Sequence, residues 1–280
     1  LLLQSGERIP LGGIHDLRTV LRKAGLGGIL APEELAAVGE TCRAARLLRT
    51  FFSGEKEEIT PTLSALAVGL TAFPGVEQAI ERAINPEGTV KDNASPTLYR
   101  LRSQIRTLQN RVRDKLESYV HGSETRKYLQ DALVTLRNGR YVIPVKQEYR
   151  QVLPGIVHDQ SASGATLFIE PMAIVEINNQ LRQVEAEEAK EVDRILTVLS
   201  AMVGQVATPA LANLKILARL DLAFAKARYS QTLNGTEPVI NDQGFLRLLS
   251  ARHPLLEGAV VPIDLELGRS FQTLVITGPN

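Results

Sequence analysis

The stretch "SPTLYRLRSQIRTLQNRVRDKLESYV" (Ser95–Val120) predicts one long helix. Ser95 is a favoured N-cap residue, and Pro96 suits the first position of a helix. Apolar residues then recur every three or four positions, which puts them on one stripe: Leu98, Leu101, Ile105, Leu108, Val112 and Leu116. A helix over 96–120 would be about 37 Å long. A stripe this narrow is typical of a helix that pairs with one other helix.

Residues 172–203 show the same pattern, and the two segments are predicted to pair. Their apolar stripe is formed by Ile174, Ile177, Leu181, Val184, Val192, Ile195, Leu199 and Val203. Glu188 is an exception, because an apolar residue is due there. Residues 96–120 carry a net charge of +4 and residues 172–203 a net charge of −3. We expect an antiparallel pair that protrudes as an arm, with its charges used for pairing or solvation; nucleic-acid contact by the arginines is the alternative.

Composition places the chain among globular proteins without a dominant charge. Of its 280 residues, 44% are hydrophobic and 22% charged, and length favours two domains. The net charge of +1 means that any nucleic-acid binding must depend on local patches. The one cysteine, Cys42, lies in a helical pattern and is expected to be a buried apolar residue of a cytoplasmic protein. No apolar run is long enough for a bilayer, so no membrane partner is expected.

Between the two long helices, the sequence predicts a β-rich insertion. We expect a short helix from Ser123 to the stop at Asn138-Gly139, followed by a strand over Arg140–Lys146 with Pro144 at an edge position. Two more strands are expected around the small-residue turn Ser161–Ala165. The expected fold class is therefore mainly α with a β-rich insertion.

The last eight residues, "TLVITGPN" (Thr273–Asn280), read as an apolar strand entering a phosphate-binding loop. Gly278, Pro279 and Asn280 match the front of G-x-x-x-x-G-K-[ST], where backbone N–H groups wrap phosphates, the lysine meets them and the hydroxyl holds Mg²⁺. A strand followed by Gly-Pro-Asn is also an ordinary turn. The lysine and hydroxyl are absent, so the chain as given is expected to bind and hydrolyse no ATP. With a first residue other than Met, this predicts a piece of a longer protein.

Arg140, Lys146, Arg150 and His158 are the candidate nucleic-acid contacts in the insertion. The basic side chains suit phosphates, but nearby acids leave the region almost neutral, so the expected grip is modest and salt-sensitive: Glu148, Asp159 and Glu170.

Two apparent sites are weaker. The residue types of a Ser-His-Asp site occur at His158, Asp159, Ser161 and Ser163, but adjacent strand residues point to opposite faces, so we expect no catalytic site. The four histidines are scattered without ligand spacing, so no metal site is expected.

Three stretches together resemble the MutS family, and within it the bacterial second-paralogue branch, MutS-two. They are "DNASPTLYRLR" (92–102), "GRYVIPVKQEYRQVLPGIVHDQSASGATLFIEP" (139–171), and "ARHPLL" (251–256) followed by "TLVITGPN". In addition, "LDLAFAKARYS" (220–230) is similar to the helix that precedes the family's ATPase domain. Mismatch readers of the family use a Phe-x-Glu motif, which Phe168-Ile169-Glu170 matches, but short matches arise by chance and we interpret this one as structural.

The resemblance implies a lever of two antiparallel coiled-coil helices that carries a β-rich clamp and leads into an ABC-type ATPase. The implied domains are a helical core (1–95), an ascending lever helix (96–120), a clamp (121–171), a descending lever helix (172–203), a core helix (204–232) and the start of the ATPase domain (233–280). The family's ATPase loop reads GPNTGGKT, of which this chain supplies Gly278-Pro279-Asn280.

The resemblance also implies a function for the full-length protein. That protein would use ATP and Mg²⁺, carry a C-terminal endonuclease domain, form a homodimer mainly through its ATPase domains, and embrace branched DNA to suppress homologous recombination. One alternative is a module that binds the ribosome or rRNA and senses or splits collided ribosomes. Another is a structural arm of the kind found in SMC-like proteins, although those coils are longer.

Overall fold

The computed structural model describes residues 7–256 and 258–278. Its chain divides into two compact units, Ile9–Ala218 and a second one that includes Arg219–Asn280. The first unit is mainly helical and contains a small antiparallel sheet, which confirms the expected fold class at that level. No single helix in the described ranges has both the length and the apolar character needed to cross a bilayer; only the bent pair of the two helices over 172–205 and 207–232 meets that criterion jointly.

Five short helices precede the first long helix in the described residues, and the first, second and fifth of them contribute to one hydrophobic core together with residues of the long helices. They are α1 (Arg18–Gly25), α2 (Pro32–Phe51), α3 (Lys56–Ile59), α4 (Pro61–Val68) and α5 (Pro74–Ala83). Pro32 and Pro74 occupy the first positions of α2 and α5, where a missing N–H has no consequence. Cys42 is buried in this core, and burial, with a smaller contribution from Glu77, raises the pKa of its thiol to about 12.

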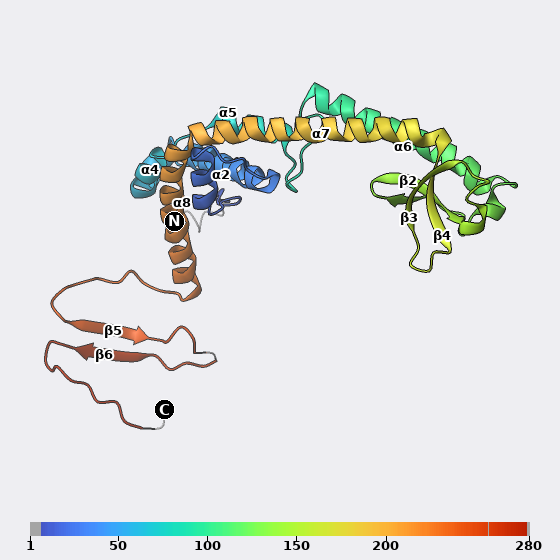
Figure 1. Cartoon of the computed structure of the whole chain (residues 1–280). Helices are drawn as coiled ribbons and strands as arrows, with labels where there is room; N and C mark the ends of the chain where they lie inside the picture. Colours follow the sequence, from blue (N-terminus) through green and yellow to red (C-terminus); the bar gives the residue numbers. More distant parts are fainter. Residues whose placement is uncertain (1–6, 257, 279–280) are drawn as a thin grey trace. The chain divides into compact units, whose positions relative to one another are not determined.

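The two long helices are present and lie side by side (Figure 1). α6 (Pro96–His121) begins at the residue that its capping signal predicts, and α7 (Met172–Gln205) begins at the first residue of the predicted apolar stripe segment. Their contacts show that they run antiparallel. Near the start of α6, the Ser95 hydroxyl donates to Glu191 Oε1 at 2.7 Å, whereas near its end Lys115 Nζ donates to the carbonyl of Ala173 at 3.1 Å.

An ion pair between the helices explains the charged residue in the apolar stripe of α7. Arg102 Nε donates to Glu188 Oε1 at 2.9 Å, and the same guanidinium reaches Asp92 at 2.7 Å. Arg102 is the only basic residue of α6 with an ion pair to α7 among the described residues, and Arg106 pairs with Asp92. The prediction that charges serve the pairing of these helices is therefore confirmed at one position.

A four-stranded antiparallel sheet lies where α6 ends and α7 begins. Its strands are β1 (Thr135–Arg137), β2 (Arg140–Lys146), β3 (Gly155–Gln160) and β4 (Thr166–Pro171), in the order β1-β2-β4-β3. The three strands expected from the sequence, and the turn at 161–165, are present. Ile143 and Ile169 of the sheet share a second hydrophobic core with Leu116 of α6 and Ile174 of α7. This core holds the sheet against both long helices.

The short helix expected from Ser123 to Asn138-Gly139 is wrong. The structure has only a 3-10 turn there, η1 (Arg126–Tyr128), followed by β1. Asn138 and Gly139 have φ values of +50° and +71°, and they form the hairpin turn between β1 and β2. Pairing with β2 supplies the backbone hydrogen bonds that a local helix would otherwise make, so tertiary context overrides local propensity.

Pro144 was expected at an edge position, but it lies in β2, an inner strand of the sheet. At Pro144 itself, however, the regular pairing with β1 has already ended. The β1 ladder stops at Val142, and beyond it the carbonyl of Pro144 accepts a hydrogen bond from the Gln130 amide at 2.9 Å. In a strand, the nitrogen and carbonyl of one residue face the same side, so the proline nitrogen faces a side where regular pairing has ended.

Beyond α7, the expected burial is only partly present and the expected last strand is absent from the described residues. α8 (Ala207–Thr232) is followed by an antiparallel pair, β5 (Leu246–Ala251) and β6 (Ile263–Leu267). The helix is buried near its start but not near its end, where Tyr229 is 55% exposed. The strand expected over Leu274–Ile276 is wrong, since these residues have no regular structure and Val275 is 76% exposed. An apolar strand needs neighbours for its backbone and side chains, and no described strand pairs with it.

The cap of α6 predicts an acid-sensitive contact with α7. Ser95 Oγ accepts from the Leu98 amide at 3.0 Å while its hydroxyl donates to Glu191. Hydrogen bonds from Arg194 and then from Ser95 lower the pKa of Glu191 from an ordinary 4.5 to about 2. A pKa lowered by folding stabilises the folded state above pH 4.5, and this stabilisation is lost as the pH falls from about 4.5 to about 2.

We therefore expect Glu191→Gln to reduce the free energy of unfolding at pH 7 by about 1.5–3 kcal/mol, the range of a hydrogen bond to a charged group. The deficit should shrink on acidification, measured by circular dichroism during thermal unfolding at several pH values. Glu187→Gln is the matched control, because the one side-chain hydrogen bond of Glu187 among the described residues comes from Gln183 in its own helix. A deficit of constant size between pH 7 and pH 3 would contradict this account.

Candidate functional site

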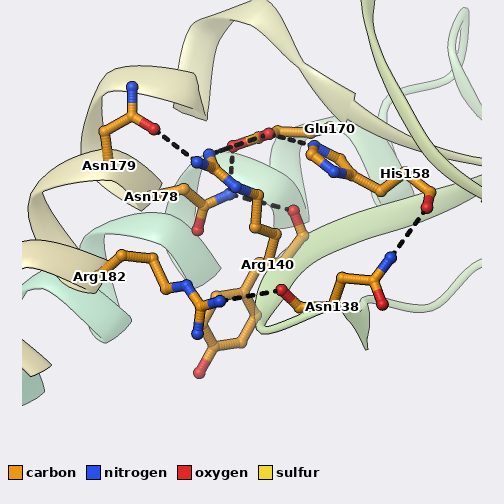
Figure 2. Close-up of polar contacts among 8 residues, drawn as sticks. Asn138, Arg140, His158, Glu170, Asn178, Asn179 and Arg182 are labelled. Carbon is orange, nitrogen blue, oxygen red and sulfur yellow. Dashed lines mark hydrogen bonds and ion pairs between the residues drawn. The ribbon is translucent and has the colours of Figure 1, made fainter. Parts of the chain in front are cut away.

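A buried carboxylate on β4 lies where β2, β3 and α7 meet (Figure 2). Glu170 of β4 has 0% exposed side chain. Its Oε1 accepts from Asn178 Nδ2 at 2.7 Å and from Arg140 Nη1 at 3.0 Å, and its Oε2 lies 2.5 Å from His158 Nε2. We call Glu170, Arg140, His158 and Asn178 the Glu170 cluster. The carboxylate can be buried because these partners compensate its charge and fill its lone pairs.

A second row of polar contacts surrounds the Glu170 cluster. Arg140 Nη2 donates to Asn179 Oδ1 at 2.7 Å, and Asn178 Nδ2 also donates to the carbonyl of Tyr141 at 3.2 Å. Because both acceptors fix the amide of Asn178, its Oδ1 is left buried without a hydrogen-bond partner. The NH₂ group of Asn178 is thus bonded to Glu170 and to the β2 backbone, while its side-chain oxygen has no partner.

The hairpin turn between β1 and β2 is also held against α7. Arg182 Nη2 donates to the carbonyl of Asn138 at 3.3 Å, and Asn138 Nδ2 donates to the carbonyl of His158 at 3.1 Å. A Cβ added at Gly139 would lie 2.3 Å from Arg182 Nη1. The φ of +71° favours glycine here, whereas the guanidinium is the flexible end of a side chain and could shift.

The structure divides the four predicted nucleic-acid contacts into two pairs. Arg140 and His158 meet at Glu170, and their side chains are 24% and 17% exposed. Lys146 and Arg150 lie elsewhere, at the end of β2 and directly after η2 (Gln147–Tyr149). The four residues do not form one cluster, and their contact with nucleic acid stays a prediction.

Lys146 and Arg150 belong to a surface that combines basic and aromatic side chains. The Tyr128 and Tyr149 rings lie 5.0 Å apart, and Lys127 Nζ lies 5.1 Å from the centre of the Tyr128 ring. Lys146 Nζ reaches the carbonyl of Lys127 at 3.5 Å. We call Lys127, Tyr128, Lys146, Tyr149 and Arg150 the tyrosine–lysine surface. It borders an open groove whose other lining residues are Gln130, Gln147, Glu148 and Ala165.

The residue types of a Ser-His-Asp site are not arranged as one. His158 contacts Glu170, whereas Asp159 pairs with Arg137 at 3.2 Å. Ser161 Oγ accepts from the Thr166 amide at 3.1 Å, inside the turn between β3 and β4. The Phe-x-Glu match at 168–170 has its glutamate in the Glu170 cluster, which agrees with a structural interpretation. The described residues contain no group of three or more acidic, histidine or cysteine side chains placed to hold a metal.

The residues expected to open a nucleotide-binding loop do not make such a site by themselves. Gly278 has a φ of +119°, and no regular strand leads into it. Pro279 and Asn280 lie outside the described residues. No lysine follows Gly278 in the chain. The ATP and Mg²⁺ site stays a prediction for the longer protein.

Sequence reasoning missed the residues that connect the sheet to α7. Asn178, Asn179 and Arg182 lie on α7 and contact partners more than 35 positions away, apart from Glu170, so their spacing carries no local signal. The Asn138-Gly139 pair was the available signal, because this dipeptide between two apolar runs favours a hairpin. The aromatic residues Tyr128 and Tyr149 likewise meet only through the fold.

No family model matches the chain. It is 53% identical over 276 residues to the endonuclease MutS2 of Geobacillus sp. (strain WCH70), covering 97% of this chain and 35% of that protein. It is 49% identical over 279 residues to the endonuclease MutS2 of Symbiobacterium thermophilum, with coverages of 100% and 35%. The chain belongs to the MutS2 branch of the MutS family.

A third MutS2 relative, named a putative endonuclease in Bacillus subtilis (strain 168), is 46% identical over 274 residues. These matches bear out the expected MutS2 branch, and they do not favour the SMC-like alternative. The chain spans about a third (35%) of the length of these curated MutS2 relatives. The activity, substrates and partners of a whole MutS2 protein are accordingly matters of proposal for this chain.

The Glu170 cluster predicts a non-additive pair of mutations. Arg140→Met leaves a buried carboxylate without its permanent cation, and we expect it to destabilise the sheet by about 3 kcal/mol. Adding Glu170→Leu should restore part of this loss, because an apolar pair carries no uncompensated charge. Hydrogen exchange of β2 and β4 amides measures the effect.

Arg126→Met is the control for loss of an arginine, since Arg126 is exposed on η1 and has no ion pair among the described residues. Exchange that is equally fast in Arg140→Met and Arg126→Met would contradict the proposed charge compensation. A double variant whose loss of stability exceeds the summed losses of the two single variants would contradict it as well.

Proposed function

We propose that this chain is the core, lever and clamp region of a MutS2-type protein that grips branched DNA and suppresses recombination. The observation that carries the proposal is the tyrosine–lysine surface, which lies on the sheet at the end of two long paired helices. It occurs in a chain about half identical to proteins named MutS2 endonucleases. In this proposal, α6 and α7 are the lever, and the sheet with η1 and η2 is the clamp.

The chemistry of the surface suits a nucleic-acid backbone. Lys127, Lys146 and Arg150 supply charge for phosphate oxygens, and contacts of this kind carry no sequence information. The paired rings of Tyr128 and Tyr149 hold the two helical turns η1 and η2 together beneath these charges. Glu148 lies in the same groove and reduces the local positive charge, so the affinity should be modest and should fall as salt rises.

The remaining functions are proposed for the longer protein by analogy with the family. We propose a cytoplasmic homodimer that joins through ATPase domains, uses ATP and Mg²⁺, and carries an endonuclease. Nucleotide binding would move the lever, and the lever would open or close the clamp around DNA. The ion pair of Arg102 with Glu188 supports a lever whose two helices move together.

The test is binding of a fluorescent four-way DNA junction, measured by anisotropy over a range of salt concentrations. The variant carries Lys127→Gln, Lys146→Gln and Arg150→Gln together. Each lost phosphate contact should reduce the slope of log K against log salt by about 0.9, so the triple variant should bind more weakly with a shallower slope.

The matched control removes three charges from α6, at Arg100, Arg111 and Arg113, which are exposed and have no ion pair among the described residues. The assignment of the surface fails if this control weakens binding as much as the first triple variant does. Sedimentation of both variants with ribosomes forms a second arm. Loss of ribosome binding with unchanged junction binding would favour the ribosomal alternative.

A further inference from the structure

We propose that the Glu170 cluster is a joint that fixes the sheet to α7, so that α7 rather than α6 sets the orientation of the tyrosine–lysine surface. Its importance for nucleic-acid binding rests on the proposed function, whereas the joint itself does not. Glu170, Arg182 and Asn179 are in this view positioning residues, which act on the surface through the sheet.

The chain connections differ at the two ends of the sheet. β4 ends at Pro171 and α7 begins at Met172, with no residue between them. Pro171 has a φ of −62°, which its ring holds near that value. α6 is instead separated from β1 by residues 122–134, whose one regular element is η1. The covalent path from the sheet into α7 is therefore short and stiff.

The polar contacts differ in the same direction. In the described part of the chain, every hydrogen bond between a strand of the sheet or its hairpin turn and a long helix involves α7: those of Asn178, Asn179 and Arg182. α6 contributes apolar side chains such as Leu116 and Val120 to the shared core. Apolar contacts lack direction and tolerate repacking, whereas charged hydrogen bonds hold a geometry.

The ties to α7 reach across the sheet. The Glu170 carboxylate contacts β2 through Arg140 and β3 through His158. One helical turn beyond Asn178, Arg182 holds the turn at Asn138. The attachment therefore has two points along α7, and two points prevent the sheet from rotating about either one.

The test uses spin labels on the whole chain, at Ser163→Cys in the turn between β3 and β4 and at Lys190→Cys on α7. Both residues are exposed. Cys42 stays in place, because it is 6% exposed and its raised pKa keeps the thiol protonated. Double electron–electron resonance then gives the distribution of distances between the labels, without any nucleic acid present.

We expect a narrow distribution in the parent. Asn179→Ala with Arg182→Ala should widen it about twofold, because the apolar contacts that remain lack direction and tolerate repacking. Replacing Arg182 with lysine beside Asn179→Ala should restore part of the narrowness, since lysine can still donate to Asn138. Glu170→Gln should widen the distribution further. The matched control is Gln180→Ala with Gln183→Ala, on the same helix, whose side chains hydrogen-bond to Glu176 and Glu187 of that helix.

A distribution of unchanged width in Asn179→Ala with Arg182→Ala would overturn the proposal, even if the thermal midpoint fell, because the contacts would then add only stability. A control that widens the distribution equally would overturn it too. If Glu170→Gln fails to fold, the exposed pair of variants decides alone. Since these distances are measured in free protein, their outcome is independent of the junction-binding test.

Discussion

A buried negative charge organises the sheet end of this protein. The carboxylate of Glu170 is excluded from water, and removing an ion from water costs several kcal/mol unless partners replace its hydration. Those partners come from β2, β3 and α7, so the strands and the helix must meet in one arrangement. The Glu170 cluster thus specifies how the sheet attaches, while the apolar core beneath it supplies most of the driving force.

The contact between α6 and α7 likewise combines apolar packing with an ion pair, whose side chains are less buried than Glu170. The apolar stripes of α6 and α7 bring the helices together, and Arg102 with Glu188 replaces one apolar contact by an ion pair. The cap of α6 depends on α7 as well, because Ser95 is shared between the Leu98 amide and Glu191. Each helix therefore provides polar partners for the other. A helix pair joined in this way suits the lever of the proposed function, whose two helices would have to move together.

The family assignment and the side-chain contacts give different information about the basic residues of the sheet. Identity near 50% places the chain in the MutS2 branch, but it does not say which side chains touch a partner. The contacts divide the predicted basic residues into two kinds. Arg140 and His158 hold the sheet together, whereas Lys146 contacts Lys127, and Arg150 directly follows Tyr149, whose ring packs on Tyr128. We therefore propose Lys146 and Arg150, rather than Arg140 and His158, as nucleic-acid contacts.

The sequence by itself determined the long helices, three of the four strands and the burial of Cys42, because periodicity, caps and turn residues are local signals. It mispredicted Ser123–Gly139 as a helix, since β1 exists only through pairing with β2. It could not place Arg140, His158 and Asn178 on one carboxylate, because they come from three different elements that lie 30, 12 and 8 positions from Glu170. Nor could it place Tyr128 against Tyr149, which belong to two separate helical turns. Only the tertiary structure decided these contacts, as compensating a buried charge depends on distance in space and not along the chain.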